Sequence, residues 1–211
     1  DYYKLKKIDA SNNLLELIKD DKSEAKHLLI NNYIQNIEFY KAKESELQKL
    51  VRVICSLPDK LIGLEYLEIF LFFSNEAKIS YSKYIVEISN DLIKSKSYKE
   101  SIDLLEKAIS LFHEKAFTDQ LMIICCKYIE ESEYHLSIEL LNKLVSQHPD
   151  AEPLLAKCFF QLSLKEKSND SKKNWLLKAF EIKNNHNKLF NNKLFESVFT
   201  EVVSNLIEVA K

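Results

Sequence analysis

Glycine is almost absent from this chain. Gly63 is the only glycine among 211 residues, and prolines stand at just three positions, Pro58, Pro149 and Pro153. Tight β-turns and phosphate-binding loops need glycine, because its backbone reaches positive φ angles without steric cost. We therefore expect an all-α fold, in which helices are joined by short polar turns.

The charge and size of the chain argue against several classes of function. Hydrophobic residues make up 46% of the sequence, which allows a globular core, and the formal net charge is −2. Arg52 is the only arginine, so the planar group that grips phosphates and guanine edges is nearly missing. The most apolar segment, 61–73, is shorter than the roughly 20 apolar residues of a membrane-spanning helix. We therefore expect no nucleic-acid partner and no membrane insertion.

Cysteine and histidine spacings give no sign of a metal or redox site. The cysteines are Cys55, Cys125, Cys126 and Cys158, and the histidines are His27, His113, His135, His148 and His186. None of them forms a CxxC pair or an HExxH motif, the spacings that bring ligands together on one metal ion. We expect buried, reduced cysteines in a cytoplasmic protein, with no metal and no cofactor.

Glu65 and Glu68 are the two carboxylates that merit attention as catalytic groups. They lie one helical turn apart in an apolar segment, where burial could raise a pKa and create an acid or base. The alternative is that they mark the narrow exposed stripe of a core helix over 60–74, which neighbouring helices cover on most sides. No Ser/His/Asp or Cys/His arrangement is visible in the sequence, and we expect the chain not to be an enzyme.

Apolar residues recur at three- and four-residue spacing along nearly the whole chain, which predicts helices. We assign residues 1–76 to an N-terminal helical region, with degenerate helical hairpins as one interpretation of it. The helices predicted in this region lie near 12–20, 24–41, 43–56 and 60–74.

The strongest signal is an internal repeat with a period of 36 residues. Segment 98–110, YKESIDLLEKAIS, and segment 134–146, YHLSIELLNKLVS, are identical at seven of thirteen positions, and each follows an apolar helix. A weaker copy, WLLKAFEI at 175–182, comes after the polar insertion KEKSNDSKK at 165–173. The pattern predicts stacked helical repeats. They cover 77–185, as units at about 82–117, 118–152 and 153–184, with a C-terminal capping helix over 186–211.

These units resemble tetratricopeptide repeats. The family pattern places an aromatic residue at the start of the second helix, a small residue three positions later, a large apolar residue four positions after that, and a proline at the end. The matching residues are Tyr98, Ser101, Leu105 and Ala108 in the first copy, and Tyr134, Ser137, Leu141 and Pro149 in the second. The usual tryptophan, leucine and glycine of the first helix are replaced by Ile85, Ile88 and Ser89, and then by Leu121, Ile124 and Cys125. The resemblance implies antiparallel helix hairpins stacked as a right-handed α-superhelix.

The resemblance also implies a binding face, because the first helix of each hairpin lines the concave surface in that family. The corresponding residues are Lys83, Val86, Asn90, Ile93 and Lys94 in the first unit, Met122, Cys126, Ile129 and Glu130 in the second, and Lys157, Gln161, Leu164 and Lys165 in the third. Mixed apolar and polar groups suit a protein or peptide. Alternatively, Val86, Ile93, Met122 and Ile129 pack against the N-terminal helices or the last helix. A clamp for a peptide carboxylate is not expected, because Val86, Asp119 and Ile123 stand where polar or basic groups are needed.

We therefore expect a protein–protein interaction module that binds a protein or peptide on its concave face, or that associates with itself. The alternative is a helical accessory domain of a larger enzyme or sensor whose active site lies outside this chain. A third interpretation, an RNA-binding helical repeat, requires a basic groove that this composition does not favour.

Overall fold

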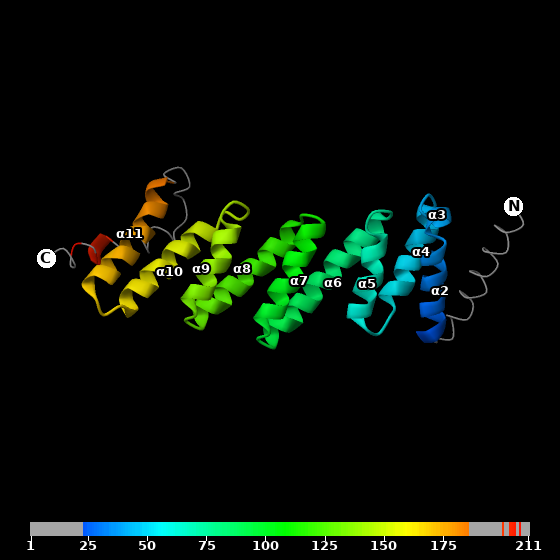
Figure 1. Cartoon of the computed structure of the whole chain (residues 1–211), viewed down its shortest axis with the longest axis horizontal. Helices are drawn as coiled ribbons and strands as arrows, with labels where there is room; N and C mark the ends of the chain where they lie inside the picture. Colours follow the sequence, from blue (N-terminus) through cyan, green and yellow to red (C-terminus); the bar gives the residue numbers. More distant parts are fainter. Residues whose placement is uncertain (1–22, 186–199, 201–202, 206, 208–211) are drawn as a thin grey trace, which may run out of the picture. The chain divides into compact units, whose positions relative to one another are not determined.

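The computed structural model describes residues 23–185, together with residues 200, 203–205 and 207. Within these residues the regular elements are all α-helices, as the scarcity of glycine predicts (Figure 1). The helix predicted near 12–20 and most of the capping helix predicted over 186–211 lie outside the described residues. The chain divides into two compact units, with the boundary between Ser95 and Lys96 in the sequence.

Helix α4 lies at the centre of the first unit and packs against α2, α5 and α6. The helices of this unit are α2 (Ser23–Gln35), α3 (Ile37–Tyr40), α4 (Glu44–Cys55), α5 (Lys60–Phe70) and α6 (Asn75–Lys94). Two neighbouring helices donate hydrogen bonds to the carboxyl end of α4. Lys26 Nζ lies 3.2 Å from the carbonyl oxygen of Ser56, and the Tyr84 hydroxyl lies 2.8 Å from that of Cys55. These donors satisfy carbonyls that have no partner inside the helix.

Side-chain caps determine where α5 and α6 begin. The Asp59 carboxylate accepts hydrogen bonds from the backbone N–H groups of Leu61 and Ile62, at 2.8 and 3.3 Å. Ser74 Oγ accepts one from the N–H group of Ala77 at 3.4 Å. Such caps satisfy amide groups of the first turn and typically stabilise a helix by about 1 kcal/mol.

The helix predicted over 24–41 is wrong in one respect, because it is interrupted at Asn36. α2 ends at Gln35 and α3 begins at Ile37, with Asn36 at φ −117° and ψ 27° between them. The side-chain amide of Asn36 donates to the carbonyl oxygen of Asn32 at 2.8 Å. A side chain that bonds to nearby backbone in this way competes with continuous helical geometry.

The apolar segment 60–74 is less covered than we predicted. Leu61, Ile69 and Phe72 are exposed, and Phe72 retains 80% of its accessible surface. α4 and α6 cover only part of α5, namely the side that carries Leu67 and Phe70. The prediction of cover on most sides is therefore wrong for this segment.

The second unit contains α7 (Tyr98–Leu111), α8 (Lys115–Glu130), α9 (Tyr134–Leu144), α10 (Ala151–Lys165) and α11 (Asn169–Asn185). Short connections join these helices, and each helix packs against the next one along the chain (Figure 1). Leu105, Leu141 and Leu176 are fully buried at equivalent positions of α7, α9 and α11. The periodic leucines of the sequence thus form the core of this unit.

The turns before α7 and α9 have the same backbone conformation. Lys96 and Ser132 lie in the left-handed region, with φ of 62° and 66°. The residues before them, Ser95 and Glu131, have φ/ψ of −80°/0° and −84°/2°. At the end of α8 the N–H group of Glu133 bonds to the carbonyl oxygen of Tyr128 at 2.8 Å, which is the bond of a Schellman cap. The 36-residue period of the sequence is therefore also a period of the backbone at these turns.

Ser137 is the point at which α8, α9 and α10 meet. It is fully buried, and its hydroxyl donates to the carbonyl oxygen of Cys125 on α8 at 3.2 Å. Ser137 Oγ in turn accepts a weak hydrogen bond from Cys158 Sγ on α10 at 3.6 Å. A small residue is needed here, because a larger side chain would force three backbones apart.

The polar insertion predicted at 165–173 is wrong. α10 continues to Lys165 and α11 begins at Asn169, so only residues 166–168 connect the two helices. The polar residues 169–173 form the first turns of α11. Short polar side chains and an acidic group such as Asp170 are favourable at this end of a helix, where amide groups point outward.

Candidate functional site

The residues predicted to line a binding face occupy matched positions on α6, α8 and α10. Asn90, Cys126 and Gln161 are all half-buried, and the next matched set, Lys94, Glu130 and Lys165, is fully exposed. Among the remaining predicted residues, Lys83 and Leu164 are exposed, whereas Val86, Ile129 and Lys157 are half-buried. Two of the four matched sets therefore lie in equivalent environments, and the other two, Val86, Met122 and Lys157, and Ile93, Ile129 and Leu164, do not.

Ile93 and Met122 differ from the other predicted face residues because they are buried. These two side chains therefore have little surface to offer a partner. Val86 and Ile129, named with them in the alternative interpretation of the sequence, keep part of their surface exposed.

Within the second unit, predicted face residues on α8 and α10 are near enough to interact electrostatically. Burial raises the pKa of the Cys126 thiol, and the charge of Lys157 on α10 is near enough to oppose that shift. Lys165 Nζ lies 4.5 Å from the ring centroid of Tyr134 and donates to the carbonyl oxygen of Ser132 at 3.4 Å. Leu164 is 48% exposed beside it. This surface, defined by Cys126, Ile129, Lys157, Gln161, Leu164 and Lys165, is called the α8–α10 face below.

Several charged residues of the predicted face have ionic neighbours on their own helix. Lys94 Nζ lies 3.3 Å from a carboxylate oxygen of Asp91, and Lys127 Nζ lies 2.7 Å from one of Glu130. These pairs are solvent-exposed, and pairs of this kind contribute little to stability, about 0 to 1 kcal/mol. These residues can therefore leave their present ion pairs and pair with charged groups of a partner at a small cost in free energy.

The other chemical candidates from the sequence are dispersed in the structure. Glu65 is exposed and Glu68 half-buried on α5. Burial raises the pKa of the Cys125 thiol to about 12 and that of Cys158 to about 11, which makes both poor nucleophiles at neutral pH. Across the residues that the structure describes, no three His, Cys, Asp or Glu side chains gather in a way that could hold a metal ion. None of the described helices is long and apolar enough to cross a bilayer.

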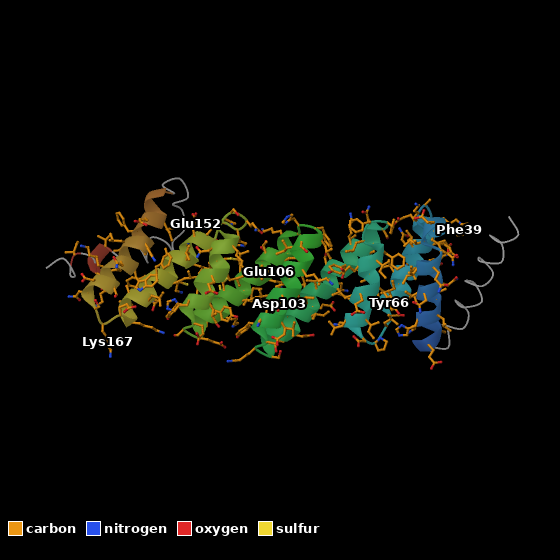
Figure 2. All side chains as sticks on the ribbon, viewed as in Figure 1. Phe39, Tyr66, Asp103, Glu106, Glu152 and Lys167 are labelled. Carbon is orange, nitrogen blue, oxygen red and sulfur yellow. The ribbon has the colours of Figure 1, made fainter. Side chains whose placement is uncertain are left out.

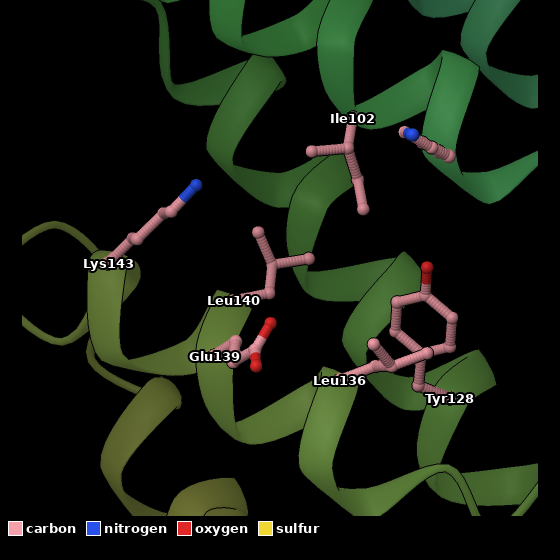
Figure 3. Close-up of a pocket in the computed structure, with 7 residues that line it drawn as sticks. Ile102, Tyr128, Leu136, Glu139, Leu140 and Lys143 are labelled. Carbon is pink, nitrogen blue, oxygen red and sulfur yellow. The ribbon is translucent and has the colours of Figure 1, made fainter.

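A hollow of about 420 Å³ lies between α7 and α9 on the second unit (Figure 3). Its floor is apolar and its rim is charged, and 420 Å³ falls within the range of known ligand pockets, about 300 to 1,000 Å³. The floor consists of Ile102, Tyr128, Leu136 and Leu140, and the rim of Lys99, Glu139 and Lys143. We call it the α7–α9 hollow.

The two sides of the α7–α9 hollow are joined by an ion pair. Lys143 Nζ lies 2.6 Å from Oε1 of Glu106, which Figure 2 shows on α7 near Asp103. Lys99 and Glu139 both project from exposed positions at the rim. Leu136 keeps 44% of its surface exposed, an unusual amount for a leucine that faces a hollow lined by other apolar groups.

The hollow was not predicted from the sequence, because the family resemblance implies a binding face on the first helix of each hairpin. Six of the seven lining residues belong to the second helices, α7 and α9. One signal was present in the sequence. The repeat register aligns Leu140 with Trp175, so an aromatic side chain replaces an aliphatic one at the same position of the next unit.

Comparisons with known proteins give no relative from which a function can be transferred. No known protein family matches the chain, and no curated protein matches it with significance. The functional assignment therefore rests on the surfaces described above.

Proposed function

We propose that this chain is a non-catalytic protein-interaction module, in which tetratricopeptide-like hairpins stack as a right-handed superhelix. The α8–α10 face binds a segment of another protein. The observation that carries this proposal is the exposure of both apolar and polar groups on that face. Ile129, Lys157 and Gln161 are half-buried, and Leu164 and Lys165 are exposed. Apolar surface supplies affinity on burial, and the polar groups select the register of the bound segment. The four free cysteines suit a reducing compartment, and we propose the cytoplasm.

The matched backbone of the turns at Lys96 and Ser132 supports the repeat part of the proposal. So does the burial of a small residue at Ser101 and Ser137 and of a leucine at Leu105 and Leu141. In a stack of repeated hairpins, equivalent helices face the same way. A partner can then contact α8 and α10 with one continuous segment.

Two leucines of similar exposure give a matched test. Leu164 on the α8–α10 face is 48% exposed, and Leu177 on α11 is 40% exposed. A photo-crosslinking amino acid at position 164 should capture a discrete protein from the native cell extract, and the same group at position 177 should not. The captured protein is then purified for affinity measurements.

Replacing Leu164 by glutamate should weaken binding of the purified partner at least tenfold, and Leu177→Glu should leave it unchanged. Both variants should keep the urea midpoint of the natural chain, since both positions face solvent. Equal crosslinking from the two positions, or an unchanged affinity of Leu164→Glu, would show that the α8–α10 face is not the binding surface.

A further inference from the structure

The α7–α9 hollow has a counterpart one repeat further along the chain. Residues of α7 align with α9 at a spacing of 36, and residues of α9 align with α11 at a spacing of 35, as the buried Leu105, Leu141 and Leu176 show. On this alignment Lys99 corresponds to His135, and Leu140 corresponds to Trp175. The position between α9 and α11 that is equivalent to the hollow therefore carries side chains of a different shape.

At the counterpart position the chain's own indole is packed among neighbouring side chains. Trp175 stacks on Phe159 of α10, with ring centroids 5.6 Å apart and planes at 20°, and it contacts the edge of His135, with centroids 6.2 Å apart. Lys178 Nζ lies 4.4 Å from the Trp175 centroid. Lys178 corresponds to Lys143 at the rim of the α7–α9 hollow.

We infer that the α7–α9 hollow binds a tryptophan side chain of a partner protein, from a segment that carries a carboxylate beside the tryptophan. The hollow has a lysine at its rim, Lys143, as Trp175 has Lys178, and it offers an apolar floor where the rings of Phe159 and His135 contact Trp175. An indole buries a large area at little entropic cost, and lysine ammonium groups interact favourably with its face. This site lies on the second helices, and the inference does not depend on the α8–α10 face.

The charges at the rim select the residues that flank the tryptophan. Lys143 is already paired with Glu106, whereas for Lys99, among the residues that the structure describes, no ion pair is observed. A carboxylate next to the bound indole would therefore pair with Lys99. Glu139, on the other helix, offers the complementary site for a basic residue further along the segment. The occupant is thus a tryptophan with an acidic neighbour on the α7 side.

Small probes test this inference on the full chain with ¹³C-labelled isoleucine and leucine methyl groups. N-acetyl-L-tryptophan carries both indole and carboxylate, N-acetyl-L-tryptophanamide lacks the charge, and N-acetyl-L-leucine lacks the indole. We expect N-acetyl-L-tryptophan to shift the methyl signals of Ile102, Leu136 and Leu140 with a Kd on the order of 1 mM, typical of a ligand of this size. The amide should bind at least threefold more weakly, and the leucine derivative at least tenfold.

Two variants of the hollow, each with a control variant elsewhere, distinguish binding in the hollow from non-specific binding. Lys99→Gln should remove the preference for the acid over the amide, whereas Lys107→Gln, at an exposed lysine on the same helix, should keep it. Leu136→Trp should fill the hollow and abolish probe binding. Leu164→Glu should leave probe binding unchanged, so failure of this inference is distinct from failure of the proposed α8–α10 face.

Three results would overturn the inference. The first is that the methyl signals of these three residues do not shift, or that N-acetyl-L-leucine binds as tightly as N-acetyl-L-tryptophan. The second is that the acid and the amide bind equally to the natural chain. The third is that the same methyl signals shift with protein concentration alone, which would mean that a second copy of the chain occupies the hollow.

Discussion

Lys96 and Ser132, 36 residues apart, share a left-handed backbone conformation, with φ of 62° and 66°. Neither is glycine, and a side chain in this region costs roughly 1 to 2 kcal/mol. Two turns that adopt the same strained geometry at the same point of the repeat are the most specific sign that one hairpin design is used twice. The shared turn conformation is hard to predict from the sequence, because neither turn contains the glycine that usually adopts a positive φ.

Glycine at these turns should stabilise the protein. We expect Ser132→Gly to raise the free energy of unfolding by about 0.5 to 1 kcal/mol, because it relieves the positive φ. Lys96→Gly should gain less, since it also removes the ion pair between Lys96 and Glu131 at 2.7 Å. Urea unfolding measures both. Asp103→Gly, at an exposed position in the middle of α7, is the control and should lower stability. The same loss for Ser132→Gly would contradict the turn assignment.

Ser137 should tolerate only small replacements. Ser137→Ala removes the hydrogen bond to the Cys125 carbonyl and should cost about 1 kcal/mol. Ser137→Leu also forces α8, α9 and α10 apart and should cost at least about 2 kcal/mol. The exposed Ser110→Leu serves as control and should change stability by less than about 0.5 kcal/mol. If the two leucine variants unfold at the same urea concentration, α9 does not pack as closely as described.

The buried thiols should make stability fall at high pH. The pKa of Cys125 is raised by burial to about 12 and that of Cys158 to about 11, from an ordinary value of 9.0. The folded state therefore holds protons that the unfolded state releases, so this contribution is complete below pH 9 and is lost as the pH rises toward 11 or 12. We expect the free energy of unfolding to drop by about 1 to 3 kcal/mol between pH 9 and pH 10.5.

Removing one thiol should flatten this dependence. Cys125→Ala should show a smaller drop over the same pH interval than the natural chain, whatever its stability at pH 7. At pH 8, a thiol reagent should reach Cys55 and Cys126 before the fully buried Cys125 and Cys158. Equal reaction rates at all four positions in the folded chain would contradict the burial on which the pH prediction depends.

Gly63 should be replaceable by alanine but not by a large residue. A Cβ at this position would lie 3.1 Å from Cε2 of Tyr84, whose hydroxyl is held by the carbonyl oxygen of Cys55. The gain in helix propensity, about 1 kcal/mol, should nearly offset the crowding in Gly63→Ala, whereas Gly63→Leu should cost at least about 2 kcal/mol. In a double-mutant cycle, Tyr84→Phe frees the ring and should favour Gly63→Ala by about 0.5 kcal/mol. Simple additivity would contradict the proposed contact.

The sequence predicted the all-helical fold and the register of the second unit, because both follow from periodicity. Apolar spacing locates buried positions such as Leu105 and Leu141, and a fixed spacing carries that assignment from one helix to the next. The break at Asn36 and the start of α11 at Asn169 were not predicted. Each depends on how one polar side chain meets the backbone, which periodicity does not record.

The candidate surfaces were harder to predict from the sequence than the fold. Met122 and Ile93 have the same spacing as exposed members of the predicted face, yet neighbouring helices cover them. The α7–α9 hollow arises because Leu136 and Ile102 belong to different helices and their side chains leave space between them. Cavities of this kind depend on the sizes of side chains on both helices of a pair. The one sign of the α7–α9 hollow in the sequence is the difference between Leu140 and Trp175 at equivalent positions.

The central claim is that the 36-residue unit is a structural module that stacks on copies of itself. A second copy of residues 115–150, inserted after Asp150, tests it directly, because α9 would face the added copy of α8 as α7 faces α8, with identical side chains at seven of thirteen aligned positions. We expect the longer chain to gain the two helices of 16 and 11 residues in its circular dichroism spectrum and to unfold at an equal or higher urea concentration. An insert that adds no helix, or that lowers the unfolding midpoint, would contradict the modular repeat on which the proposed binding surfaces depend.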